Sequence, residues 1–233
     1  AVMAAKDYLQ TAIDQGTLEV PSGINFEFAG NYENQVRAEK RLSLLIPLVL
    51  LIIAVILYMQ FRKVSVMLMV FSGIAVAFSG GFILIWLYGQ DWFMNFAMFG
   101  NNLRDVFSIE TVYLSVAVWV GFIALFGIAT DDGVIMASYL EQVFEKNKPQ
   151  NKQQIVQSVI EAGSRRVRPC LMTTATTLLA LLPVLSSTGR GSDVMVPMAI
   201  PAFGGMLIEL ITLFVIPVLY ALHYQRKMKK EVR

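Results

Sequence analysis

The 233-residue sequence contains one cysteine, one histidine and few charged residues. The single cysteine, Cys170, excludes a disulfide framework within the chain. The single histidine, His223, lies in a basic tail and is interpreted as a solvated interfacial residue rather than a metal ligand. Charged residues make up 15% and hydrophobic residues 56% of the chain, which is more apolar than a typical soluble domain. A net charge of +2 is not the footprint of a nucleic-acid-binding protein.

Long apolar runs dominate the sequence. Five of them reach the length of about 20 residues that a helix needs to cross a bilayer. Because the first begins at residue 43, none is a signal peptide. The predicted fold class is therefore a mainly α membrane protein with a five-helix transmembrane bundle over residues 41–233. The predicted spans are residues 43–60, 65–88, 113–138, 169–187 and 195–222.

Basic residues are divided unevenly between the two sides of this bundle. Thirteen of the 19 Lys and Arg residues fall near Arg62, in residues 141–168 or in the tail, which all lie on one side. Cytoplasmic loops carry such an excess. We therefore expect a cytoplasmic C-terminus and a cytoplasmic helical loop at 141–168. Residues 1–40 and an amphipathic insert at 89–111 are expected outside the membrane on the other side.

Residues 1–40 are predicted to be the end of a soluble α+β domain. Residues 2–15 have a helical pattern, and residues 18–20 and 24–28 alternate like strands. Forty residues cannot bury a core alone, so this segment is expected to pack on a partner or to belong to a larger domain. The polar stretch 31–42 is expected to form a helix that leads into the first span.

Two adjacent acids, Asp131 and Asp132, lie deep in the third apolar run. An ionised acid in hydrocarbon costs about 2.5 to 3.5 kcal/mol on insertion scales, so such residues mark ion or proton pathways. Neighbouring helix residues point about 100° apart, so the two acids cannot address the same partner. Asp131 shares a face with Ala124 and Gly127, which would admit a neighbouring helix. We therefore prefer Asp131 as the proton carrier, and a static hydrogen-bonded carboxylate is the alternative.

The fourth run carries a polar stripe. Cys170, Thr173, Thr174 and Thr177 recur at helical spacing along one side. Threonine in membrane helices often bonds only to its own helix carbonyls, which makes plain packing an equally good interpretation. The stripe could instead form a neutral path for protons beside an aspartate. Cys170 is either a soft metal ligand or an inert small side chain.

The fifth run places Met195, Met198, Met206 and Glu209 near one helical direction. Thioether sulfur selects Cu(I) among transition metals, so a methionine ladder that ends in a carboxylate suggests a metal path. Methionine is also common core filler, and on periodicity alone this packing role is favoured.

Several short motifs carry a resemblance that periodicity could not supply. In chain order they are Gly30-Asn-Tyr-Glu-Asn-Gln35, Val120-Gly-Phe-Ile-Ala-Leu125, Gly127-Ile-Ala, Arg165-Arg-Val-Arg-Pro169, Met172-Thr173, Thr188-Gly-Arg-Gly-Ser-Asp193 and Gly204-Gly-Met206. Over nearly its whole length the chain resembles the C-terminal portion of resistance-nodulation-division efflux pumps. Within them it is most similar to the heavy-metal branch and its Cus-type copper and silver exporters.

The resemblance implies a fold and a set of site residues. The five spans would be helices eight to twelve of a twelve-helix pump, and residues 1–40 the end of its periplasmic porter domain. Asp131 stands where Cus-type pumps carry a proton-relay acid, and Met195 where they carry a transmembrane methionine of the metal path. Cys170 occupies the place of a relay lysine. Asp132 and Glu209 are acids where the family is usually neutral.

The resemblance also implies an activity. The protein would be a proton antiporter and not an enzyme, located in the bacterial inner membrane and exporting Cu(I) or Ag(I) without a resident cofactor. It would work as a homotrimer with the N-terminal part of the pump, a periplasmic adaptor and an outer-membrane channel.

Three other functions remain open at the level of sequence. A divalent-metal exporter for zinc, cobalt or cadmium, or a multidrug exporter, would share the fold. An intramembrane aspartyl protease would need two aspartates on facing helices, whereas Asp131 and Asp132 are adjacent and no Gly-x-Gly-Asp motif occurs.

Overall fold

The computed structural model describes residues 8, 9, 11–13, 15, 16, 18, 31–98 and 101–231. The chain divides into two compact units, Ala1–Leu44 and Leu45–Arg233. In the first unit, helical residues are found at 8–9 and 11–13, and helix α2 begins at Asn31. The strand predicted at 24–28 lies outside the described residues, as do the last two residues of the strand predicted at 18–20.

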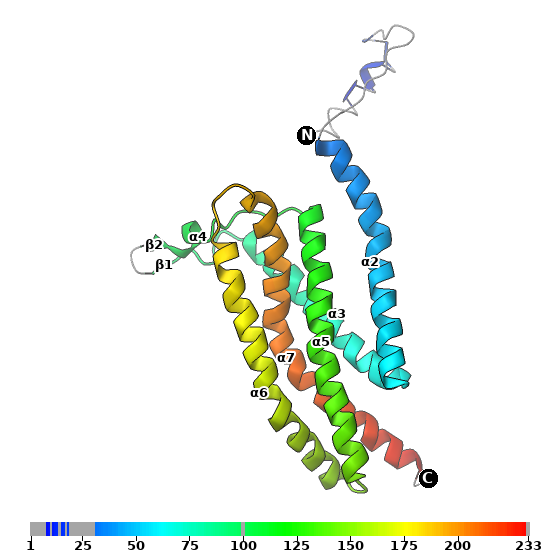
Figure 1. Cartoon of the computed structure of the whole chain (residues 1–233). Helices are drawn as coiled ribbons and strands as arrows, with labels where there is room; N and C mark the ends of the chain where they lie inside the picture. The colour runs from blue at the N-terminus through cyan, green and yellow to red at the C-terminus, as the bar shows by residue number, and fades with distance from the viewer. Residues whose placement is uncertain are drawn as a thin grey trace. The chain divides into compact units, whose positions relative to one another are not determined.

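The second unit is a bundle of long helices (Figure 1). Among the described residues, five helices are long and apolar enough to cross a membrane, which confirms the predicted mainly α fold with five spans. The elements are α2 (Asn31–Phe61), α3 (Val64–Tyr88), β1 (Ala97–Met98), β2 (Asn101–Asn102), α4 (Leu103–Val106), α5 (Val116–Asn147), α6 (Lys152–Leu185) and α7 (Ser192–Glu231).

The connections define two ends of the bundle. One end, called the insert end, carries residues 89–115 and the connection 186–191 between α6 and α7 (Figure 1). The other, called the link end, carries residues 62–63 and 148–151. Helices α5 and α6 run through most of the predicted loop 141–168, because charged and polar residues continue a helix readily once it has left the apolar run.

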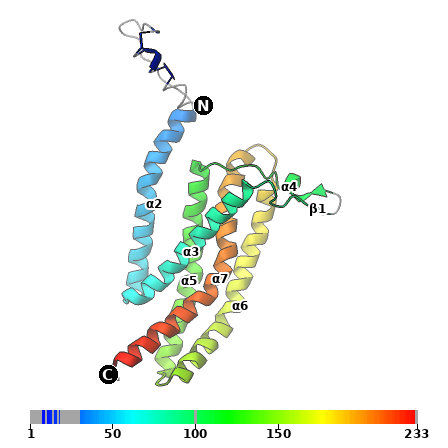
Figure 2. The same cartoon turned by 180° about the vertical axis from the view of Figure 1, so that it is seen from behind.

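Helix α7 lies in the middle of the unit. It packs on α3, α5 and α6, and two opposite views both place it between α5 and α6 (Figures 1 and 2). Small residues allow these contacts to be close. A Cβ added at Gly80 of α3 would lie 2.7 Å from the Gly204 carbonyl oxygen of α7, and one added at Gly121 of α5 would lie 2.7 Å from Cγ of Pro201.

Polar contacts join the helices at the link end. The Asn147 amide of α5 donates hydrogen bonds to Ser158 (3.3 Å) and Glu161 (3.1 Å) of α6. Lys63, between α2 and α3, pairs with Glu141 of α5. The hydrogen bond to Glu141 raises the pKa of Lys63 above its usual value.

The predicted amphipathic insert contains a hairpin of two strands, each two residues long, and the one-turn helix α4. Ala97 pairs with Asn102 in the hairpin, and the Arg104 guanidinium donates to the Gln90 carbonyl oxygen at 2.8 Å. Trp92 and Phe96 are exposed, as expected for aromatic side chains at a membrane surface.

Candidate functional site

Asp132 is buried between two helices of the bundle. It lies on α5 with 8% of its surface exposed, and its Oδ2 accepts a hydrogen bond of 3.1 Å from the Thr174 hydroxyl of α6. Cys170 lies one turn before Thr174 on α6 and is buried as well. Hydrogen-bond partners matter because burying an unpaired polar group is costly. Asp132, Thr174 and Cys170 form a polar cluster across the α5–α6 contact, here called the Asp132 cluster.

The Thr174 hydroxyl has two acceptors within reach. Its oxygen also lies 2.9 Å from the Cys170 carbonyl oxygen of its own helix. A hydroxyl donates one proton and can also accept. When Asp132 is ionised, Thr174 donates to the carboxylate; when Asp132 is protonated, the acid can donate to Thr174 while Thr174 donates to the carbonyl. The cluster can therefore satisfy Asp132 in either protonation state.

Glu209 of α7 is the second buried acid. Only 2% of its surface is exposed, and within the described part of the chain neither carboxylate oxygen has a hydrogen-bond partner. A buried acceptor without a partner costs about 1 to 3 kcal/mol.

The packing of α5 on α7 shows which residues of α5 lie level with Glu209. The two helices run in the same direction, since Gly205 packs on Leu125 and, further toward the link end, Gly133 lies beside Ile216. The residue of α5 level with Glu209 is therefore Ala129 or one close to it. Asp132 follows less than one turn later, so the two acids lie at similar depth in the bundle.

Asp131 occupies a different surface of α5. It is exposed in the described bundle, together with Ala124 and Gly127 on the same face. A Cβ added at Gly127 would meet no described atom within 4 Å. The small-residue face that the sequence indicated is thus open, and the neighbouring acid Asp132 is the one that other helices cover.

The threonine stripe on α6 also contains both exposed and buried side chains. Thr173 is exposed and donates to the Cys170 carbonyl oxygen at 2.8 Å. Thr177 donates to the Thr173 carbonyl oxygen at 2.9 Å. Within the described bundle, Thr174 alone among the three threonines of the stripe has a hydrogen bond to another helix.

The methionines of α7 differ in how much of their surface is exposed. Met195 and Met198 are 45% and 38% exposed near the insert end, whereas Met206 is fully buried. Met206 belongs to an apolar cluster with Ala77 of α3 and Leu125 of α5. The side of α7 that carries all three is therefore open near the start of the helix and covered by α3 and α5 further along.

Cys170 is distant from the exposed methionines. It is buried and lies 15 residues before the end of α6, about 22 Å along the helix at 1.5 Å per residue. Met195 lies in the first turn of α7, at the insert end. Among the described residues, no group of three or more His, Cys, Asp or Glu side chains could hold a metal ion.

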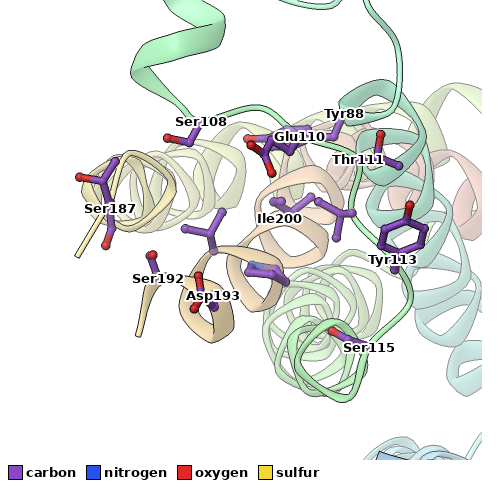
Figure 3. A pocket seen from close by; sticks show the side chains of 14 residues that line it. Tyr88, Ser108, Glu110, Thr111, Tyr113, Ser115, Ser187, Ser192, Asp193 and Ile200 are labelled. Carbon is purple, nitrogen blue, oxygen red and sulfur yellow. The ribbon is translucent and has the colours of Figure 1, made fainter. Parts of the chain in front are cut away.

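A polar pocket at the insert end was not anticipated from the sequence (Figure 3). It is bounded by the segment 108–115, the connection before α7, the end of α3 and the start of α7. Its lining includes Glu110 and Asp193. Its sequence signal is the density of Ser and Thr in two segments far apart in the chain, which only the fold brings together.

The chain matches the AcrB/AcrD/AcrF family over residues 3–100 and 106–223. It belongs to this family. The match includes all five spans, the Asp132 cluster and the methionines of α7, and it confirms the family resemblance that the sequence motifs indicate.

Three relatives illustrate the branch. The chain is 38% identical to the cation efflux system protein CusA of Escherichia coli K12, over 92% of this chain and 19% of the relative. It is 32% identical to the putative cation efflux system protein SilA of Salmonella typhimurium, over 96% and 20%. It is 30% identical to the cobalt-zinc-cadmium resistance protein CzcA of Cupriavidus metallidurans, over 91% and 18%.

A solved structure shares the fold. The crystal structure of a heavy metal efflux pump matches with a TM-score of 0.60 and 29% identity, over 94% of this chain and 19% of the pump. This chain thus spans about a fifth of the length of the relatives it matches.

Proposed function

We propose that this chain is the C-terminal membrane part of a proton-driven exporter of heavy-metal cations, with Cu(I) or Ag(I) as cargo. The proposal rests on the family and on one structural observation: two acids, Asp132 and Glu209, are buried at similar depth among membrane-spanning helices. Intramembrane acids are costly to keep, and they mark ion and proton pathways.

The Asp132 cluster supports a role in proton transfer. Because Thr174 can either donate to Asp132 or accept from it, the carboxyl group can gain and lose a proton without losing its partner. A change in protonation would then turn the Thr174 hydroxyl between α5 and its own helix. Such a change of partner is a route by which a proton could alter the contact between α5 and α6.

Asp131 is proposed as the outward-facing member of the relay. Its exposed face carries Ala124 and Gly127, and an ionisable group facing lipid would be costly. We propose that another part of the assembled pump covers this face and pairs with Asp131. Glu209 would be the inner member, because no described residue satisfies its carboxyl group. Thr173, the neighbour of Thr174 in the sequence, is proposed as a weaker member of the relay.

Met195 and Met198 are the proposed metal-path residues. Their exposed thioethers lie one turn apart near the insert end of α7, and polarisable uncharged sulfur selects Cu(I) over hard cations. Met206 is a weaker candidate because it is packed in the core. Cys170 is assigned to the Asp132 cluster rather than to the metal path.

Export of divalent zinc, cobalt or cadmium is the second candidate. The relative CzcA is named for resistance to these three metals, and its identity to this chain is close to that of SilA. Carboxylate oxygens suit borderline and hard cations better than thioethers do. The two candidates therefore differ in whether Met195 is needed.

We propose a multi-pass protein of the bacterial inner membrane with a cytoplasmic C-terminus. It would act as a homotrimer with the rest of the pump, a periplasmic adaptor and an outer-membrane channel. The exposed apolar side chains of α2, such as Leu51 and Ile56, are suited to contact with lipid.

Growth assays test the cargo. A strain that lacks its own exporters would express the intact pump or its Met195→Leu variant on copper, silver, zinc, cobalt or cadmium. Leucine keeps nearly the same volume, so packing losses should stay below about 1.5 kcal/mol. We expect Met195→Leu to lose copper and silver tolerance. Full tolerance of both metals, at normal protein levels, would remove Met195 from the path.

A second assay tests the proton coupling. Asp131→Asn should abolish proton-coupled efflux in vesicles with an imposed pH gradient, and Asp105→Asn, at an exposed acid of the insert, should retain it. Efflux at the wild-type rate by Asp131→Asn would exclude Asp131 from the relay. If the intact pump improves growth only on zinc, cobalt or cadmium, the assignment of copper and silver as cargo fails. The assignment as a metal exporter then still stands.

A further inference from the structure

A second pocket at the insert end is apolar. It lies between the insert and the last turns of α3 and α6, which both end there (Figure 1). Its volume is about 220 Å³, and eight of its nine lining residues are Leu, Phe or Met. The lining residues on the three helices α3, α6 and α7 are Leu84, Tyr88, Leu182, Leu185, Phe203 and Leu207.

The pocket lies on the side of α7 that faces away from α5. Gly205 of α7 packs on Leu125 of α5. Phe203 and Leu207 each lie two residues from Gly205, and two residues turn a helix by about 200°. Both side chains therefore project from the opposite side of α7. Because Leu207 is 42% exposed, the pocket opens to the surface of the bundle there.

The surface next to this opening is also apolar. Ile211, Phe214 and Val218 follow Leu207 at helical spacing on the same side of α7, and each is more than half exposed. Helix α7 is long and apolar enough to cross a membrane, and lipid chains are as apolar as leucine side chains. The pocket is therefore continuous with a surface suited to contact with lipid.

The rest of the pump is expected on another side of the bundle. The open face of α5 proposed to meet it carries Gly127 and Asp131. Gly127 is two residues from Leu125, so it projects about 200° away from the side of α5 that contacts α7. The pocket lies beyond α7 as seen from α5. Its position thus favours lipid over another part of the pump as its occupant.

Met94 indicates that the insert is fitted to this pocket. It lines the pocket together with Phe93 and Phe107. Its φ of 51° lies in the left-handed region, which costs a residue other than glycine about 1 kcal/mol or more. Such strain is typical of segments that clamp a ligand, and a flexible thioether adapts to an irregular apolar surface.

The size and chemistry of the pocket fit a hydrocarbon chain. An apolar cavity of about 150 Å³ stays dry and binds benzene, so this larger pocket has room for a longer stretch of hydrocarbon. A water molecule needs two to four polar partners, whereas Tyr88 is the one lining residue with a polar side chain.

We infer that this pocket binds an acyl chain of a bilayer phospholipid. The chain enters beside Leu207 and packs between the last turns of α3 and α6, against the insert residues Phe93 and Met94. It fills space that the side chains leave open and joins the insert to the helices. This lipid site is distinct from the proposed export path, and its occupant does not depend on which metal the pump exports.

A photoreactive phospholipid tests the site. The intact pump would be placed in nanodiscs that contain phosphatidylcholine with a diazirine in one acyl chain, and the labelled residues would be mapped by mass spectrometry after irradiation. Leu84 and Leu185 line the pocket but are buried, so only a chain inside the pocket reaches them. We expect label on both, and on Phe214, which reports contact with the surrounding lipid.

Leu207→Trp and Leu182→Trp fill the pocket from two helices. Each should lower the labelling of Leu185 about tenfold, because the indole and the chain cannot occupy the same space. Ile211→Trp is the matched control, since Ile211 lies one turn beyond Leu207 on the same side of α7 and does not line the pocket. It should leave the labelling of Leu185 unchanged, and Phe214 should be labelled equally in all three variants.

Two results would overturn the site. One is a wild-type pump labelled at Phe214 but at neither Leu84 nor Leu185, which would mean that the pocket is empty or filled by another segment of the pump. The other is unchanged labelling of Leu185 in both pocket-filling variants. Circular dichroism and gel filtration show that each variant is folded before its labelling is compared.

Discussion

The Thr174 hydroxyl of α6 lies 3.1 Å from Oδ2 of Asp132 on α5, and this hydrogen bond joins the two helices inside the bundle. It gives a buried acid a partner from a neighbouring helix. Thr174 also reaches the Cys170 carbonyl oxygen of its own helix, so the hydroxyl can exchange one bond for the other.

Thr174→Val should weaken the contact between α5 and α6. Valine has nearly the shape of threonine but cannot donate, so Asp132 would be left without this partner. We expect a loss of about 1 to 3 kcal/mol in the free energy of unfolding and slower proton-coupled efflux. Thr174→Ser, which keeps the hydroxyl, should retain efflux. Equal thermal unfolding of the Val variant and the wild type would show that the bond contributes nothing.

Glu209→Met should have the opposite effect on stability. The described residues provide no hydrogen bond to either carboxylate oxygen, so the substitution breaks none while it removes a costly buried group. We expect a gain of about 1 to 3 kcal/mol in the free energy of unfolding, with slower efflux. Thermal unfolding in one detergent compares it with Asp132→Asn, which keeps an acceptor for Thr174 and should be nearly neutral. A destabilised Met variant would indicate a partner for Glu209.

The crossing of α3 and α7 should not tolerate a methyl group at Gly80. A Cβ there would lie 2.7 Å from the Gly204 carbonyl oxygen, which is backbone and cannot move aside cheaply. We expect Gly80→Ala to lower the thermal unfolding midpoint. Gly127→Ala is the control in this chain, since its Cβ would meet no described atom within 4 Å. The prediction fails if both variants unfold alike.

The two ends of the bundle should lie on opposite sides of the membrane. Reporter domains fused after Gln90, at the insert end, and after Lys148, at the link end, should report a periplasmic and a cytoplasmic location. The excess of basic residues near the link end is the physical reason. The same compartment for both fusions would contradict the five-span topology.

The number and the centres of the spans were predictable from the sequence because a bilayer sets a minimum length for an apolar helix. The exact helix ends, such as Asn147 of α5 and Lys152 of α6, were not. The helices in 141–168 agree with the helical loop expected there, because leaving the apolar region does not end a helix.

The choice between Asp131 and Asp132 could not be made from the sequence alone. Small residues occur on more than one face of α5: Gly127 shares the face of Asp131, and Gly133 lies on another face. The structure places Gly133 against Val70 of α3 and leaves Gly127 open. Which small-residue face is covered depends on the positions of α3, α6 and α7, which are not encoded in the local pattern of α5.

The polar pocket could not be predicted from local sequence patterns, for the same reason. Glu110 and Asp193 are separated by two long helices in the chain, and only the packing of α5, α6 and α7 brings their segments together. Hydrogen-bonded stripes on one helix can be found by periodicity, but a cavity between segments distant in sequence cannot.

The central position of α7 has a consequence for biogenesis. Helices α3, α5 and α6 leave the ribosome before α7, yet each of them packs on α7. Chains are made at about 5 to 20 residues per second, and N-terminal parts generally fold first. Here the earlier helices must wait in the membrane with the faces at Gly80 and Gly121 unmatched until the last helix inserts. A ribosome stalled before Ser192 would therefore leave an intermediate with exposed small-residue surfaces, which other membrane helices can approach closely.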